Sequence, residues 1–124
     1  MSTLLFVDDE KNLLKLYQRE FGEEGYKVFT ASSGMEALEM LRLQAIDLVI
    51  LDIRMPGLDG LETLKQVMES SSNPPIILNS AYTYFKDDFL SWAAKAYVVK
   101  SSDVSELKAR TKEVLEAAAA AKGH

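Results

Sequence analysis

The sequence contains no cysteine, and its single histidine, His124, is the last residue. Disulfide bonds, thiolate catalysis and cysteine metal sites are therefore excluded. Lysine and arginine number 14 against 19 aspartates and glutamates, which argues against nonspecific binding of nucleic acid or of anionic membranes. No stretch reaches the roughly 18 apolar residues of a membrane-spanning helix, and the N-terminus lacks the basic segment of a signal peptide. We expect a cytoplasmic protein with no direct contact to nucleic acid or membrane.

The composition is that of a folded domain. Of the 124 residues, 48% are hydrophobic and 27% are charged, so the chain can bury a core of ordinary size. The length fits one domain. We predict a single domain over residues 1–122, with residues 123–124 as a frayed C-terminal end.

Short apolar segments rich in β-branched residues alternate with segments of helical periodicity. The predicted strands are Leu4–Val7, Tyr26–Ala31, Leu48–Leu51, Ile76–Ser80 and Ala96–Lys100. Helical patterns fill the intervals, including residues 82–95, and a last helix follows the fifth strand. This alternation predicts an α/β fold with right-handed crossovers. The economical arrangement is a five-stranded parallel sheet of order 2-1-3-4-5, doubly wound with five helices.

Local signals predict where the helices begin and end. Gly25 follows the first helical pattern and is expected to adopt a left-handed conformation there. Ser33 stands three residues before Glu36, the spacing of a capping box. Ser102 or Asp103 is expected to cap the last helix.

Polar residues end or directly follow four of the five predicted strands. Asp8 and Asp9 follow the first strand, Asp52 the third, and Ser80 and Lys100 end the fourth and fifth. In a doubly wound sheet these positions share the edge where ligands bind. Taken singly, each has an ordinary explanation: a helix-start pair for Asp8–Asp9, turn residues for Asp52 and Ser80, and a solvated strand end for Lys100.

Taken together, these side chains favour phosphoryl transfer. Clustered carboxylates repel one another unless a cation neutralises them, and carboxylate oxygens with water are the ligands of Mg²⁺. Lys100 and Ser80 would then contact a phosphoryl group from the other side. Asp52 is the candidate nucleophile, because a carboxylate can accept a phosphoryl group as an acyl phosphate. The chain has no glycine-rich phosphate loop and no internal histidine, so the phosphoryl group must come from another molecule.

The whole pattern resembles the receiver domain of two-component response regulators, the CheY-like family. The matching residues are, in chain order, Asp8-Asp9, the stretch DIRMPGLDG that begins at Asp52, Ser80-Ala81, and Tyr97-x-x-Lys100. The resemblance implies that a sensor histidine kinase or phosphotransfer protein phosphorylates Asp52 in a phosphorelay. It also implies a signalling protein that catalyses only its own phosphorylation and dephosphorylation, and is not otherwise an enzyme.

The resemblance further implies roles for the neighbouring residues. Asp9 and Asp52 would bind Mg²⁺ directly, Asp8 would act through metal-bound water, and the backbone carbonyl of Arg54 would be a further ligand. Lys100 would contact the phosphoryl group. Ser80 and Tyr97 would form the switch, the Ser80 hydroxyl moving towards the phosphoryl group and the Tyr97 ring turning inward; on its own, Tyr97 is an ordinary half-buried strand aromatic.

Two other functions stay open. An aspartate-nucleophile phosphatase of the haloacid dehalogenase type would have Asp-x-Asp, but Arg54 occupies the second position. A domain that keeps the fold for phosphorylation-independent binding would lack part of the site, and only Ser101, where the family usually has proline, departs from it. We predict a trans Lys100–Ser101 bond with an altered loop, or a strained cis bond, since a non-proline cis bond costs about 3 kcal/mol.

Two further hypotheses concern residues beside the predicted site. Tyr82 and Arg54 flank it, and their bulk is expected to slow hydrolysis of the acyl phosphate. Six of the aromatic residues lie between Tyr82 and Tyr97, more than one helix and one strand readily bury. Residues 82–115 are therefore a candidate surface for a homodimer or a downstream protein, although inward packing of these side chains is about equally compatible with the pattern.

Overall fold

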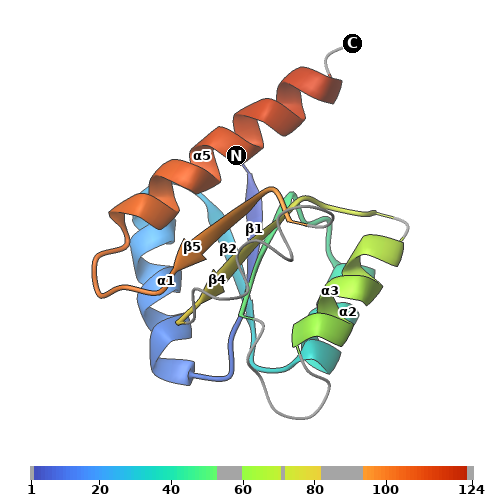
Figure 1. The fold of residues 1–124 in the computed structure, drawn as a ribbon, viewed down its shortest axis with the longest axis horizontal. Helices are drawn as coiled ribbons and strands as arrows, with labels where there is room; N and C mark the ends of the chain where they lie inside the picture. Colours follow the sequence, from blue (N-terminus) through green and yellow to red (C-terminus); the bar gives the residue numbers. More distant parts are fainter. Residues whose placement is uncertain (1, 53–59, 71, 82–93, 123–124) are drawn as a thin grey trace.

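The computed structural model describes residues 2–52, 60–70, 72–81 and 94–122 (Figure 1). Its elements are β1 (Thr3–Val7), α1 (Lys11–Glu23), β2 (Lys27–Ala31), α2 (Gly34–Leu43), β3 (Leu48–Leu51), α3 (Gly60–Glu69), β4 (Ile76–Ser80), β5 (Ala96–Val99) and α5 (Ser105–Lys122). The helix predicted for 82–95 falls mainly on residues outside the described part. Ala94 and Lys95, which are described, are not helical, so that prediction extends too far towards β5.

All five strands are parallel, in the order β2-β1-β3-β4-β5. The predicted topology is therefore confirmed. β3 and β4 are buried along their whole length, as expected of central strands covered on both faces. Within the described residues, no helix combines the length and the apolar character needed to cross a membrane.

Helices cover both faces of the sheet. Figure 1 shows α1 and α5 on one face and α2 and α3 on the other. Alternate strand residues point to opposite faces, so the sheet divides its apolar side chains between two clusters. Phe6 and Ile50 pack with Phe21 of α1 and Leu107 of α5. Val7, Leu51 and Tyr97 belong to the other cluster, under α2 and α3.

The end of α1 follows from its glycine. Gly25 has φ +98°, which is accessible to glycine at low cost, so the predicted left-handed residue is confirmed. Its N–H donates to the carbonyl of Gly22 at 3.0 Å, and the N–H of Tyr26 donates to that of Phe21 at 3.2 Å. The Phe21 and Tyr26 rings also contact each other, with centroids 6.2 Å apart. This is a Schellman motif with its apolar contact, and it turns the chain from α1 into β2.

The start of α2 confirms half of the predicted capping box. The Ser33 hydroxyl accepts a hydrogen bond from the Glu36 N–H at 3.2 Å. The Glu36 carboxylate, however, accepts from the N–H and the hydroxyl of Ser32, both at 2.7 Å, rather than from the Ser33 N–H. The reciprocal half of the motif is therefore displaced by one residue.

The connection from β5 to α5 is built from two side-chain turns. The Ser101 hydroxyl accepts from the Asp103 N–H at 3.1 Å, and the Asp103 carboxylate accepts from the Ser105 N–H at 2.9 Å. Asp103, one of the two predicted caps, therefore serves the helix start. No peptide bond between described residues is cis, so the Lys100–Ser101 bond is trans, the first of the two predicted alternatives.

Candidate functional site

The strands place three charged residues at one edge of the sheet. Asp8, Asp52 and Lys100 each follow the last residue of a strand. The Asp8 N–H donates to Ala31 at 3.1 Å, that of Asp52 to Val7 at 2.9 Å, and that of Lys100 to Ser80 at 2.8 Å. These bonds extend the sheet by one residue, so the three side chains start from fixed backbone positions.

The Lys100 side chain connects the carboxylates. Its Nζ lies 2.8 Å from Oδ2 of Asp8, 2.9 Å from Oδ2 of Asp52 and 3.4 Å from Oε1 of Glu10. The side chains of Asp8 and Asp52 are 3% and 5% exposed, against 63% for Glu10. Two buried carboxylates therefore share one ammonium, the arrangement that a buried negative charge requires.

Burial and ion pairing oppose each other at this site. Burial raises the pKa of Asp8, and the hydrogen bonds from Lys100 and from the Glu10 N–H offset only part of that rise. Burial alone would lower the pKa of the Lys100 ammonium, but its hydrogen bonds to Asp8 and Asp52 outweigh burial and raise that pKa. Lys100 therefore stays positively charged at neutral pH.

A group of oxygen donors lies beside this ion pair. Carboxylate oxygens of Asp8, Asp9 and Glu10 lie within 4.8 Å of one another, and the Glu10 N–H holds Asp8 by a hydrogen bond to its Oδ1 at 2.9 Å. Asp8 is buried while Asp9 and Glu10 are exposed, so the group opens to solvent. An all-oxygen donor set with room for water fits Mg²⁺.

Three of the four predicted metal ligands lie within the described residues. Asp8 and Asp9 are neighbours, and Asp52 is joined to Asp8 through Lys100. Arg54, and with it the proposed carbonyl ligand, lies outside the described residues, as does Tyr82. Glu10 was not predicted as part of the site; the signal was its position directly after Asp8-Asp9.

The predicted switch residues lie on neighbouring strands. Ser80 ends β4 and is fully buried, and Tyr97 on β5 is 5% exposed. In the sheet register Tyr97 pairs with Leu78, and Ser80 pairs with Val99. Side chains two residues apart share a face, so both lie on the α2–α3 face. Tyr97 is therefore buried rather than half-buried in this structure.

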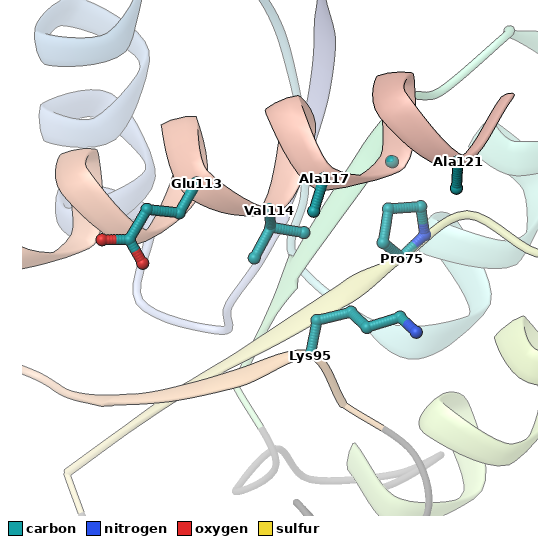
Figure 2. Close-up of a pocket in the computed structure, with 7 residues that line it drawn as sticks. Pro75, Lys95, Glu113, Val114, Ala117 and Ala121 are labelled. Carbon is teal, nitrogen blue, oxygen red and sulfur yellow. The ribbon is translucent and has the colours of Figure 1, made fainter. Parts of the chain in front are cut away.

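A groove lies at the other end of the sheet. Pro75, Lys95 and the C-terminal half of α5 line a groove of about 350 Å³ (Figure 2). Pro75 and Lys95 directly precede β4 and β5, so this groove is at the opposite end of the sheet from Asp52.

Comparison with known proteins gives a consistent result. The model of the response regulator receiver domain family matches residues 4–112. Response regulator ArlR of Staphylococcus aureus is 35% identical over 116 residues, which are 93% of this chain and 53% of ArlR. The chain thus spans about half the length of the curated relatives it matches.

Solved structures agree with this assignment. Response regulator TrrA of Thermotoga maritima, in complex with Mg²⁺ and BeF, is 45% identical with a TM-score of 0.85, over 92% of this chain and 99% of TrrA. A complex of histidine kinase ThkA with TrrA gives 45% identity and a TM-score of 0.84, over 93% and 99%. The receiver domain of Francisella response regulator 1452 is 28% identical with a TM-score of 0.86, over 95% and 99%.

Proposed function

Since the chain belongs to the response regulator receiver domain family, we propose that Asp52 accepts a phosphoryl group from a sensor histidine kinase or a phosphotransfer protein. The observation that carries this proposal is the Asp52 carboxylate itself. It is buried at a strand end, 2.9 Å from the ammonium of Lys100, which also binds Asp8. A nucleophile is thus held beside a fixed positive charge.

The proposed step is a transfer between two side chains. An oxygen of the Asp52 carboxylate attacks the phosphorus atom of a phosphohistidine, a P–O bond forms, and the P–N bond breaks. The imidazole nitrogen that leaves takes up a proton. Water later cleaves the acyl phosphate and restores the carboxylate with release of inorganic phosphate. The chain would catalyse only these two reactions of its own side chain and convert no separate substrate.

The donor group fits a requirement for Mg²⁺. We propose Asp8, Asp9, Asp52 and the carbonyl of Arg54 as its ligands, with the Glu10 carboxylate alongside. Bound there, Mg²⁺ would neutralise charge on the phosphoryl oxygens. The Lys100 ammonium already contacts the Asp52 carboxylate. It would therefore also contact a phosphoryl group attached to Asp52. A relative of 45% identity is known in complex with Mg²⁺ and BeF, which supports this part of the proposal.

Phosphorylation would be passed on through Ser80 and Tyr97. The Ser80 hydroxyl would move towards the phosphoryl group, and the Tyr97 ring would adjust within the α2–α3 face. Residues 82–115 would then bind a second copy or a downstream protein. A kinase complex of a relative supports the upstream partner. We propose that the phosphoryl transfer takes place in the cytoplasm, and that the protein makes no direct contact with nucleic acid or membrane. We also propose that the receiver domain spans residues 1–122.

The test is phosphorylation with acetyl phosphate and Mg²⁺, followed by intact mass. The wild-type chain is expected to gain one phosphate that hydroxylamine removes, as an acyl phosphate requires. Asp52→Asn is expected to gain none. Asp47→Asn is the matched control, because it changes a carboxylate in the connection before β3 and keeps an acceptor for the Thr3 N–H. Phosphate on Asp52→Asn, or no phosphate on the wild type, would contradict the proposal.

A second measurement tests the surface of residues 82–115. Sedimentation of the phosphorylated and unphosphorylated chain reports on dimers, and the fluorescence of Trp92, the sole tryptophan, reports on that segment. If both stay the same after complete phosphorylation, this surface is not the one that responds.

A further inference from the structure

A buried hydrogen bond lies on the α1–α5 face of the sheet, near the strand ends that carry Asp8, Asp52 and Lys100. The Asn79 side-chain amide donates to the Tyr17 hydroxyl at 2.9 Å, across 62 positions of sequence. Both residues are 3% exposed. Tyr17 belongs to the cluster under α1 and α5, so the bond joins α1 to β4 on the face opposite to Ser80. A pair of apolar side chains could fill the same space, and neither would need a hydrogen-bond partner.

The two residues contact the strand ends that carry the site. Asn79 directly precedes Ser80 and pairs in the sheet with Val98, two residues before Lys100. The Tyr17 ring stacks on Phe6, two residues before Asp8, with centroids 4.9 Å apart. A movement of this pair would therefore displace the ends of β1, β4 and β5 together.

A small cavity extends from the pair to the connection after Lys100. It has a volume of about 10 Å³, and its lining includes Tyr17, Asn79, Ser101 and Asp103. That is close to the space of one water molecule, and Val98, Val99, Val104 and Leu107 complete the lining together with Glu106. Polar and apolar side chains thus mix in the space between Tyr17 and the start of α5.

The charges of Asp8, Lys100 and Asp52 also affect the pKa of the Tyr17 hydroxyl. Burial raises its pKa, the hydrogen bond from Asn79 lowers it, and Asp8, Lys100 and Asp52 each act on it through their charges. The hydroxyl therefore stays protonated, and it lies within electrostatic reach of the three groups that the proposed transfer uses.

We propose that Tyr17 and Asn79 are positioning residues for phosphoryl transfer to Asp52, because their hydrogen bond fixes the ends of β4 and β5 and thereby the places of Ser80 and Lys100. The inference rests on the proposed function and adds a requirement to it. Neither residue touches the phosphoryl group. Small displacements of groups around a reacting atom can reduce a rate by up to about 100-fold, so the effect should appear in the rate and not in metal binding.

The decisive variant is the double substitution Tyr17→Phe with Asn79→Leu. Each single substitution leaves one buried polar group without its partner, whereas the double substitution removes both groups. We expect the double variant to have a urea midpoint nearer the wild type than Asn79→Leu alone. We expect its rate constant for phosphorylation by acetyl phosphate at saturating Mg²⁺ to fall by about tenfold, with the half-saturating Mg²⁺ concentration unchanged. Tyr26→Phe, in the turn between α1 and β2, is the matched control and should keep the wild-type rate.

The outcomes separate this inference from the proposed function. A wild-type chain that takes no phosphate contradicts the proposed function, and the inference falls with it. A phosphorylated wild type with a double variant of equal rate overturns only the inference and leaves a structural hydrogen bond. If the double variant does not fold, Tyr17→Phe alone decides, since it removes one oxygen: an unchanged rate at saturating Mg²⁺ overturns the inference, and a lowered rate with unchanged Mg²⁺ dependence supports it.

Discussion

The Nζ atom of Lys100 lies 2.8 Å from Oδ2 of Asp8, although two strands separate β5 from β1 in the sheet. The lysine side chain therefore reaches across the ends of β4 and β3 and meets Asp52 on the way, at 2.9 Å. Its single positive charge is therefore shared by the two buried carboxylates. Lys100 thus stabilises the fold by pairing with the two buried carboxylates, and it is also a candidate contact of the phosphoryl group.

Replacing Lys100 with methionine should destabilise the metal-free protein. The substitution keeps much of the side-chain volume but leaves Asp8 and Asp52 buried without their counter-charge. Loss of one partner from a buried ion pair costs about 3 kcal/mol or more. We expect a decrease of that size in the free energy of unfolding, measured with urea at pH 7 in the presence of EDTA.

The control for this substitution is Lys112→Met, which removes an exposed lysine of the same type from α5. A surface substitution of this kind changes stability by no more than about 0.5 kcal/mol. Equal stabilities of the Lys100 and Lys112 variants would show that the carboxylates do not depend on Lys100 in the metal-free state.

The sheet and the location of the site could be predicted because both depend on local pattern. Leu48–Leu51 is a continuous apolar run, and parallel connectivity then places Asp52 at the same edge as Asp8 and Lys100. The partners of individual polar groups could not be predicted. The hydrogen bond between Asn79 and Tyr17 joins residues 62 positions apart, and no spacing rule connects them. The only local signal was a polar residue within the apolar strand Ile76–Ser80.

Short-range geometry escaped prediction for a different reason. The spacing of Ser33 and Glu36 correctly marked the start of α2, but the Glu36 carboxylate binds Ser32. The backbone of Ser33 is extended, with φ −153° and ψ 164°, and which neighbouring N–H faces the carboxylate depends on such angles. Residue types alone do not specify them.

Thr111→Val should stabilise the protein. Thr111 on α5 is fully buried, and its Oγ1 has no hydrogen-bond partner among the described residues. Valine has the same shape and nearly the same helix propensity, so the substitution removes the cost of a buried unpaired hydroxyl. We expect the free energy of unfolding to rise by about 1 kcal/mol. Thr111→Ser keeps the hydroxyl and loses a methyl group, so it should lower stability; a loss in the valine variant instead would reveal a partner for Oγ1.

The interaction of Glu36 with Ser32 should appear as a pH-dependent contribution to stability. Hydrogen bonds from the Ser32 N–H and hydroxyl lower the pKa of Glu36 below its ordinary value of 4.5. A lowered folded-state pKa means that the ionised carboxylate stabilises the fold above pH 4.5 and that this contribution is lost as the pH falls through the folded-state pKa. We expect Glu36→Gln to be less stable than the wild type by about 0.5 kcal/mol at pH 7.

The measurement for Glu36 is urea unfolding of both chains at pH 7 and at successive values below 4.5. The difference between them should shrink as the wild-type carboxylate becomes protonated. Glu116→Gln, an exposed site on α5, is the matched control. A Glu36 difference that persists unchanged at the lowest pH would mean that the charge of the carboxylate does not stabilise the start of α2.

Alanine substitutions at Gly22 and Gly25 should change stability in opposite directions, although the two glycines are three residues apart. Apart from the adjacent residues and the nearby backbone of its own helix, an added Cβ meets no atom within 4 Å at either position, so packing against other elements does not decide the outcome. Gly22 lies within α1, where alanine is favoured over glycine by about 1 kcal/mol. Gly25 has φ +98°, a conformation that costs an L-residue about 1–2 kcal/mol. We therefore expect Gly22→Ala to raise the urea midpoint and Gly25→Ala to lower it. A stabilising Gly25→Ala would mean that the Schellman turn is not required to join α1 to β2.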